Sequence, residues 1–199
     1  MEVDLDKTSK KIVEATIKLL EKEGVTGTTT IKIAKSAGVS EVTIFRKFKN
    51  KENLLKTTKQ YYLNYFLEEI DNVFRYDENK KISELLKDIW WNILDFLDNN
   101  INIIQISVED RRNTEDTRIV TEISDKIINN LTEIFQKSIE KGEIRDINPT
   151  VAALNVYSMI FQSLLLWKFF GKEPVEDLNT YLNDFLNIFL NGITANGGN

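Results

Sequence analysis

Between residues 28 and 54, a small residue, a glycine and an apolar residue stand at the spacing of two short helices that cross at a turn. Ala34 is followed four residues later by Gly38, and Ile44 comes six residues after the glycine. A small side chain lets a second helix cross closely, a glycine supplies the positive φ of the turn, and an apolar anchor packs the second helix back on the first. The stretch therefore predicts a helix-turn-helix over about 29–48.

The second of these helices carries its own start signal and an inward face. Ser40 is placed to cap the helix, and Val39 and Ile44 occupy the two positions of a hydrophobic staple. Ile44 and Phe48 lie one turn apart, and we expect both to pack inward. The remaining side chains would face outward, toward a groove: Glu41, Val42, Thr43, Arg46 and Lys47.

Apolar residues recur at helical spacing along the rest of the chain, and no alternating strand pattern interrupts them. The expected helices cover residues 50–75, 82–97, 100–112 and 119–139. Pro149, behind an Asn148 cap, and Pro174 would each open a further helix. The prediction is an all-α chain of about nine helices.

The composition excludes several kinds of catalytic site. The 199 residues include no cysteine and no histidine. The chain therefore offers no thiol nucleophile and neither of the two commonest zinc ligands. No pair of carboxylates stands out from the solvated charges. We expect no metal, no cofactor, no catalytic residue and no enzyme activity.

Charge is divided unevenly along the chain. The 26 Lys+Arg and 31 Asp+Glu give a net charge of −5, which by itself argues against a nucleic-acid partner. Residues 1–56, however, hold 12 basic and 8 acidic residues, a net charge of +4, and residues 57–199 carry −9. The low overall pI therefore belongs to the second part. An acidic remainder would keep a duplex away from every surface except the basic head.

Nothing in the sequence predicts export or a membrane span. The first residues are acidic and lack both the basic and the apolar segment of a signal peptide. The most apolar run, residues 159–170, is too short and too polar to cross a bilayer. We expect a cytoplasmic protein.

The pattern around the helix-turn-helix resembles the TetR family of transcriptional regulators. The matching residues are Thr28-Thr29, Ile33-Ala34, Ala37-Gly38-Val39-Ser40, Thr43, Phe45, Phe48, Lys51 and Leu54. The resemblance implies a helix-turn-helix DNA-binding domain over residues 8–68. It implies a ligand-binding and dimerisation domain, built as a helical bundle, over residues 69–199.

The resemblance also implies roles for individual positions. Those that would meet phosphates are Thr28, Thr29, Thr43, Phe45, Lys47 and Lys51, those that would meet base edges are Glu41 and Val42, and Ser40 and Arg46 complete the candidate DNA-binding set. Phe45 stands where the family usually has a tyrosine, so the hydroxyl contact is lost. Val42 replaces a usual glycine or alanine and could touch a thymine methyl group.

Aromatic and apolar side chains of the second domain have two interpretations, because helical spacing is typical of a core as well as of a binding site. The candidate ligand pocket comprises Trp90, Ile93, Ile123, Tyr157, Phe161 and Gln162. The candidate dimer interface, in the last two helices, comprises Leu164, Trp167, Leu182, Phe185 and Phe189.

The resulting hypothesis is a homodimeric repressor that binds a palindromic operator through the helix at about 40–46. A small, largely apolar effector would release it. The alternative is a helical small-molecule-binding or scaffolding protein with a degenerate helix-turn-helix. The acidic total, Glu41 and Phe45 favour that alternative. Activation instead of repression also stays open.

Overall fold

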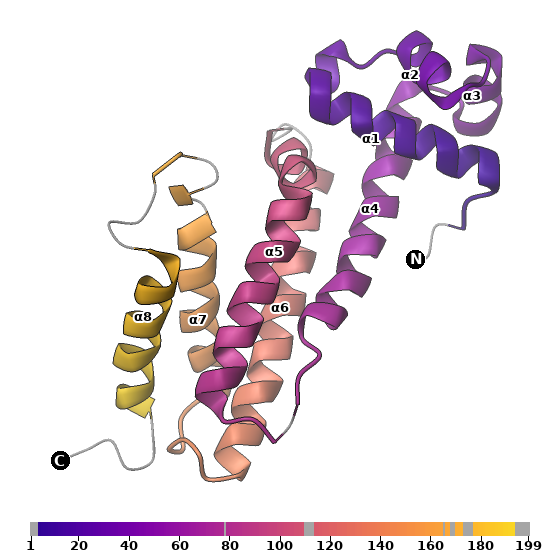
Figure 1. Ribbon diagram of the computed structural model, residues 1–199. Coiled ribbons are helices and arrows are strands. Elements are labelled where there is room, and N and C mark those ends of the chain that lie inside the picture. The colour runs from indigo at the N-terminus through magenta and orange to yellow at the C-terminus, as the bar shows by residue number, and fades with distance from the viewer. Residues whose placement is uncertain are drawn as a thin grey trace. The chain divides into compact units, whose positions relative to one another are not determined.

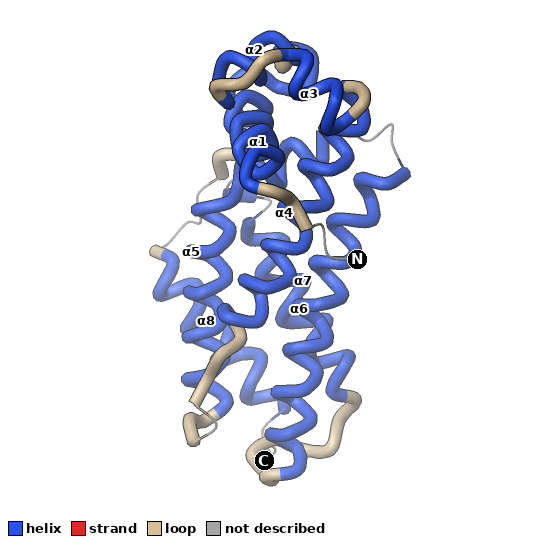
Figure 2. Tube along the Cα trace, turned by 90° about the vertical axis from the view of Figure 1, so that its right-hand side faces the viewer, coloured by secondary structure: helices blue, strands red, loops and turns tan. Residues whose placement is uncertain are grey.

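The computed structural model describes residues 4–77, 79–109, 114–164, 166–167, 170–172 and 177–193. Within these ranges the chain is helical and contains no strand (Figure 2). The helices are α1 (Lys7–Gly27), α2 (Thr30–Ala37), α3 (Glu41–Phe48), α4 (Lys51–Val73), α5 (Ile82–Glu109), α6 (Thr114–Glu140), α7 (Pro149–Leu164) and α8 (Leu178–Ile193) (Figure 1). The prediction of an all-α fold is confirmed, with eight helices in the described part where about nine were expected.

The chain divides into two compact units. The first comprises Met1–Glu69 and Asn100–Ile123, and the second comprises Ile70–Asn99 and Ser124–Asn199. The DNA-binding domain expected at 8–68 and the ligand-binding and dimerisation domain expected at 69–199 are functional domains. Their boundaries stay a prediction.

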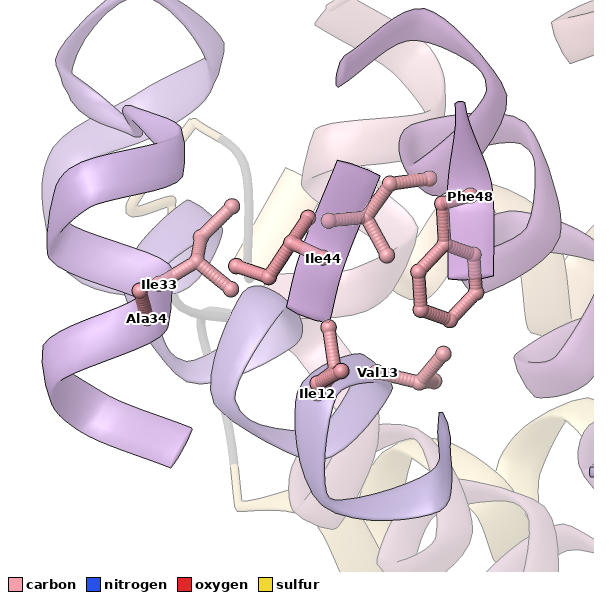
Figure 3. Packing of buried hydrophobic residues seen from close by; sticks show 7 residues of the cluster. Ile12, Val13, Ile33, Ala34, Ile44 and Phe48 are labelled. Carbon is pink, nitrogen blue, oxygen red and sulfur yellow. The ribbon is translucent and has the colours of Figure 1, made fainter. Parts of the chain in front are cut away.

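The core of the first unit joins α1, α2, α3 and the start of α4 (Figure 3). Its buried members are Ile12, Val13, Ile33, Ala34, Ile44, Phe48 and Leu54. Ile44 and Phe48 point from α3 into this cluster, as the sequence predicts. Burying side chains of this size contributes about 1.5–3 kcal/mol each, so the cluster fixes the inward face of α3 and thereby decides which residues face out.

Local signals set the ends of the first three helices. Asp6 caps α1, and its Oδ1 accepts hydrogen bonds from the backbone N–H groups of Thr8 and Ser9 at 3.0 Å each. Gly38 ends α2 with φ 66°, which confirms the positive φ expected at the turn. At Gly24 the backbone leaves the helical conformation, with φ 66° and ψ 179°, so α1 is interrupted by a kink there before its last residues reach Gly27.

In the rest of the chain, two helix boundaries differ from the prediction. Helix α5 runs unbroken to Glu109, so the segments expected as separate helices at 82–97 and 100–112 are one helix, as far as it is described. Helix α8 begins at Leu178 because Asp177 Oδ1 accepts from the N–H groups of Asn179 and Thr180. Pro174, expected to open this helix, lies outside the described residues.

The start of α7 agrees with the prediction. Pro149 is its first residue, and Asn148 Oδ1 accepts from the N–H groups of Thr150 and Val151 at 3.0 and 3.3 Å. Among the helices described, none is long and apolar enough for a membrane span.

Candidate nucleic-acid interface

Helix α3 presents two different faces. Ile44 and Phe48 are buried in the core cluster, while the Val42 side chain is 75% exposed and that of Phe45 is 47% exposed. Arg46 lies on the same outward side and is also exposed. Exposed Val and Phe side chains on a short helix leave apolar surface uncovered, so this row is available to a partner.

The start of α3 is tied together by hydroxyl groups. Ser40 caps the helix, and its Oγ accepts from the Thr43 N–H at 3.2 Å, which confirms the predicted cap. The Ser40 and Thr43 hydroxyls lie 2.9 Å apart and are hydrogen-bonded to each other. Both residues thus sit at the N-terminus of a helix, where the dipole and free N–H groups favour an anion.

Glu41 is held by the preceding helix. Its Oε1 accepts a hydrogen bond from the hydroxyl of Thr30 in α2. This contact turns one carboxylate oxygen toward α2 and away from a groove. The cytosine contact that the sequence suggests for Glu41 would have to break or share this bond, and Thr30 is a partner that sequence reasoning missed.

Lys47 is joined to the start of α1. Its Nζ lies 2.6 Å from Oδ2 of Asp6. The pKa of the Asp6 carboxyl is lowered to about 2, and the hydrogen bond from Lys47 is the main cause. Hydrogen bonds from the Ser9 and Thr8 N–H groups act in the same direction. Sequence reasoning missed Asp6. An Asp directly before an amphipathic helix is a cap signal, but nothing in the sequence places it beside a residue 41 positions away.

The residue after α3 has an unusual backbone. Lys49 has φ 71° and ψ −50°, and among the described residues it is the one non-glycine with a positive φ. The N–H of Asn50 donates to the carbonyl of Phe48 at 2.8 Å across it, which makes a γ-turn of the rare, strained kind. Such a conformation costs about 1–3 kcal/mol and is typical of sites under functional constraint.

Comparison with known proteins identifies the family to which this helix-turn-helix belongs. Residues 12–58 match the family model described as "Bacterial regulatory proteins, tetR family". Over 155 residues the chain is 33% identical to YvkB of Bacillus subtilis, an uncharacterised HTH-type transcriptional regulator, and the match covers 77% of this chain and 79% of YvkB. The chain belongs to the TetR family. As a member, it is a DNA-binding transcriptional regulator.

Solved structures of TetR-family proteins have the same fold. A protein of Mesorhizobium loti assigned to the TetR family of transcriptional regulators superposes with a TM-score of 0.80 at 19% identity, over 95% of this chain and 98% of that one. The regulator FadR of Bacillus subtilis, solved in complex with stearoyl-CoA, gives a TM-score of 0.66 at 24% identity, over 96% and 99% of the two chains.

Within this TetR-family helix-turn-helix, two further predicted phosphate contacts, besides Lys47 and Thr43, have partners within the chain. Thr28 is fully buried, and its hydroxyl donates to the carbonyl of Gly24 at 2.8 Å. This burial argues against a direct phosphate contact by Thr28. Lys51 Nζ donates to the carbonyl of Val25 at 3.1 Å and so fastens α4 to the bent end of α1. Thr29, in contrast, is exposed and caps α2.

The structure spreads the predicted pocket residues over different environments. Trp90 and Ile93 are buried in the interior of the second unit, whereas Phe161 and Gln162 are exposed. The half-buried Tyr157 stacks on Phe161, and its hydroxyl is hydrogen-bonded to that of Ser124 at 2.5 Å. Burial raises the pKa of Tyr157, and the Ser124 hydrogen bond acts against that rise. Ile123, which is half-buried, belongs to the first unit. A shared ligand pocket stays a prediction.

Trp90 has one property that the sequence did not indicate. Its side chain is 1% exposed, and no acceptor for its Nε1–H lies among the described residues. The rings of Trp167 and Tyr181 pack against it, each with its centroid 6.3 Å away. A buried donor without an acceptor costs about 1–3 kcal/mol.

The predicted dimer residues divide in the same way. Leu182 is 2% exposed and packs in the core of this chain, so little of its side chain is available at the surface; its place in an interface stays a prediction. Phe185 and Phe189 are half-buried and stack on each other, and Phe189 also contacts Phe135 of α6. Trp167 is half-buried against Trp90 and Tyr181, and the side chain of Leu164 lies outside the described residues.

The exposed apolar residues of α7 and α8 are different ones. Val151, Leu154 and Phe161 are exposed at helical spacing on one side of α7, and Ile188 of α8 is 76% exposed. Sequence reasoning missed Val151, Leu154 and Ile188 and placed Phe161 in the pocket, because every face of these helices carries apolar residues, and only packing shows which of them point outward.

Proposed function

We propose that this TetR-family regulator is a homodimeric repressor that binds a palindromic operator through α3 and is released by a small, largely apolar effector. The observation that carries the DNA-binding part is the orientation of α3. Its inward residues are locked in the core, and Val42, Phe45 and Arg46 stand free on the other side. A helix held in this way can enter the major groove as a rigid body.

The outward residues divide into base and backbone contacts. Arginine forms paired hydrogen bonds to guanine, and a valine side chain suits a thymine methyl group, so we assign base contacts to Arg46 and Val42. Thr29, Ser40 and Thr43 lie at helix N-termini, and we assign them to phosphates, together with the ring of Phe45 and with Lys47. Glu41 has no role in this scheme because Thr30 holds its carboxylate.

The composition of the last two helices supports a dimer. Helix α7 contains no charged residue, and Asp184 is the one charged residue of α8. Two copies of such a surface can meet without like-charge repulsion, although the whole chain carries a net charge of −5. We therefore assign the interface to the outward residues Val151, Leu154, Phe161 and Ile188.

The buried Trp90 donor supports an effector that carries an acceptor oxygen. An apolar chain would suit the aromatic rings around Trp90, and a carbonyl oxygen would satisfy its Nε1–H. Stearoyl-CoA, the ligand of the FadR structure, has both an acyl chain and a thioester carbonyl. We propose that the effector of this protein is of that acyl class.

Helix α4 offers a route from effector to DNA. It starts beside the helix-turn-helix, and its last residues, from Ile70, belong to the second unit. Two α3 helices must match half-sites about one helical turn, or a multiple of it, apart. An effector that binds better to a mismatched spacing lowers operator affinity by linkage. This function is binding, without catalysis, in the cytoplasm.

The test begins with selection of a binding sequence from a random duplex library by the purified protein. We expect an inverted repeat. Titration with stearoyl-CoA should then release the selected duplex, coenzyme A alone should not, and Trp90→Phe, which keeps a ring but loses the donor, should weaken the response. A promoter that carries the selected sequence should be repressed in transcription in vitro.

The effector class and the DNA-binding function can each be contradicted by a separate result. Unchanged duplex affinity at saturating stearoyl-CoA would contradict the effector class. Failure to enrich any sequence, with weak binding that does not depend on salt, would favour the helical scaffolding alternative, because phosphate contacts make binding steeply salt-dependent.

A further inference from the structure

An ion pair joins two segments of the DNA-binding head that are far apart in sequence. Lys47 of α3 and Asp6 at the start of α1 are 41 residues apart, and their Nζ and Oδ2 atoms lie 2.6 Å from each other. The side chain of Lys47 is 20% exposed, and that of Asp6 is 60% exposed. The carboxylate, at the start of α1, is thus the solvent-facing partner of a lysine on α3, the helix proposed to meet a polyanion.

The two oxygens of Asp6 have separate partners. Oδ1 accepts from the Thr8 and Ser9 N–H groups and caps α1, while Oδ2 holds Lys47. Asparagine caps helices as well as aspartate does, but it carries no charge. The substitution Asp6→Asn therefore separates the two roles: it can keep the cap, and it removes the ion pair.

A lysine that is already neutralised by a carboxylate is a weaker phosphate ligand than a free one. Each phosphate neutralised by a free cation releases counterions and adds about 0.9 to the slope of log K against log salt. If Lys47 leaves Asp6 for a phosphate, the bound complex holds an unpaired carboxylate near the backbone. If Lys47 stays, the phosphate loses its partner. Both outcomes weaken binding.

We propose that Asp6 competes with the DNA backbone for Lys47 and thereby limits the affinity of α3 for duplex DNA. The inference rests on the proposed function, in which Lys47 is a phosphate contact. It adds an intramolecular acidic competitor at the cap of α1. The low pKa of Asp6 is consistent with it, since the carboxyl group stays ionised wherever duplex binding is measured.

The experiment compares four variants with the wild type: Asp6→Asn, Asp4→Asn, Lys47→Gln and the double variant Asp6→Asn/Lys47→Gln. Asp4→Asn is the matched control, because Asp4 is an exposed carboxylate two residues away and the charge change is the same. Affinity is measured by fluorescence anisotropy over a salt series, on duplexes of about three helical turns. Circular dichroism melting checks that each variant keeps its fold.

We expect Asp6→Asn to bind several-fold more tightly than the wild type and to steepen the salt slope by about 0.9, the value for one added phosphate contact. Asp4→Asn should change affinity less and leave the slope near that of the wild type. In the Lys47→Gln background, Asp6→Asn should lose its effect.

Three results would overturn the inference while wild-type binding stays intact. These are an Asp6→Asn variant that binds like the wild type, one that binds only as Asp4→Asn does, and an Asp6→Asn effect that persists without Lys47. Absence of salt-dependent binding by the wild type and by Asp6→Asn alike would instead contradict the proposed function, and the inference with it.

Discussion

The helix-turn-helix and the last two helices expose surfaces of opposite character. On α3 the exposed row includes Arg46, and the neighbouring polar side chains of Glu41 and Lys47 are bonded to Thr30 and Asp6. The exposed faces of α7 and α8 are apolar or amide-rich, with Asp184 as the one charged side chain over both helices. A surface of charged and hydrogen-bonding side chains, Arg46 among them, suits a polyanion, and an uncharged surface suits another protein surface.

Burial, more than residue type, separates binding residues from folding residues on these helices. Apolar residues occur on both surfaces, yet Val42 and Ile188 are exposed while Ile44 and Leu182 are buried. We therefore expect the exposed members to matter for binding and the buried members for folding.

The largest expected effect concerns this contrast within α3. Ile44→Ala should lower the free energy of unfolding by about 2–5 kcal/mol, since it opens a cavity in the core cluster. Val42→Ala should change it by no more than about 0.5 kcal/mol and should still weaken binding to the selected duplex. Urea denaturation and duplex titration measure the two quantities. Equal loss of stability in both variants would break the comparison.

In the C-terminal helices, the same contrast predicts a change in oligomeric state. Ile188→Asp should shift the protein toward monomers, because it places a charge on the proposed apolar interface. Asn183→Asp adds the same charge to another exposed position of α8 and serves as the control. Sedimentation velocity measures both. A dimer that survives Ile188→Asp would remove Ile188 from the interface.

A smaller effect is expected from the strained turn behind α3. Lys49→Gly and Lys49→Ala remove the same charge, but only glycine adopts φ 71° without strain. We expect the glycine variant to be more stable than the alanine variant by about 1 kcal/mol. Both should weaken duplex binding alike if the Lys49 charge reaches a phosphate. Equal melting temperatures would show that the turn is unstrained.

The last effect is absent at neutral pH: it is a loss of stability in alkali caused by Tyr62, a residue of the first unit. Burial raises the pKa of Tyr62 to about 12 from 10.0, and the nearby Glu14 and Glu21 carboxylates add to the rise. The folded state then holds the phenol proton more tightly than the unfolded state. The stabilisation is complete below pH 10 and is lost as the pH rises toward 12. Tyr62→Phe should flatten the fall in melting temperature over that range, and an unchanged fall would contradict this cause.

The sequence predicted the helix-turn-helix well because local interactions fix it. The cap at Ser40, the positive φ at Gly38 and the inward face of α3 depend on residues within a few positions of one another. The partners of Lys47 and Glu41 could not be predicted in this way, because Asp6 and Thr30 reach them only through the packing of α1 and α2 around α3.

Prediction was least successful where apolar residues surround a helix. In α8, Leu182 and Ile188 both fit an apolar stripe, and only the packing of the second unit makes one a core residue and the other an exposed one. The sequence also failed to predict how far α5 extends, for a different reason. Asn99 and Asn100 favour a break in an isolated helix, but the helix continues through them.

We propose that the exposed row of α3 binds duplex DNA, and the salt dependence of the affinity gives a direct test. The affinity of the wild type for its selected duplex, plotted as log K against log salt, should fall steeply, by about 0.9 per phosphate contact. Arg46→Gln should weaken binding and relax the sequence preference, with the fold unchanged. A flat plot, or an Arg46→Gln variant that binds as tightly and selectively as the wild type, would contradict the account.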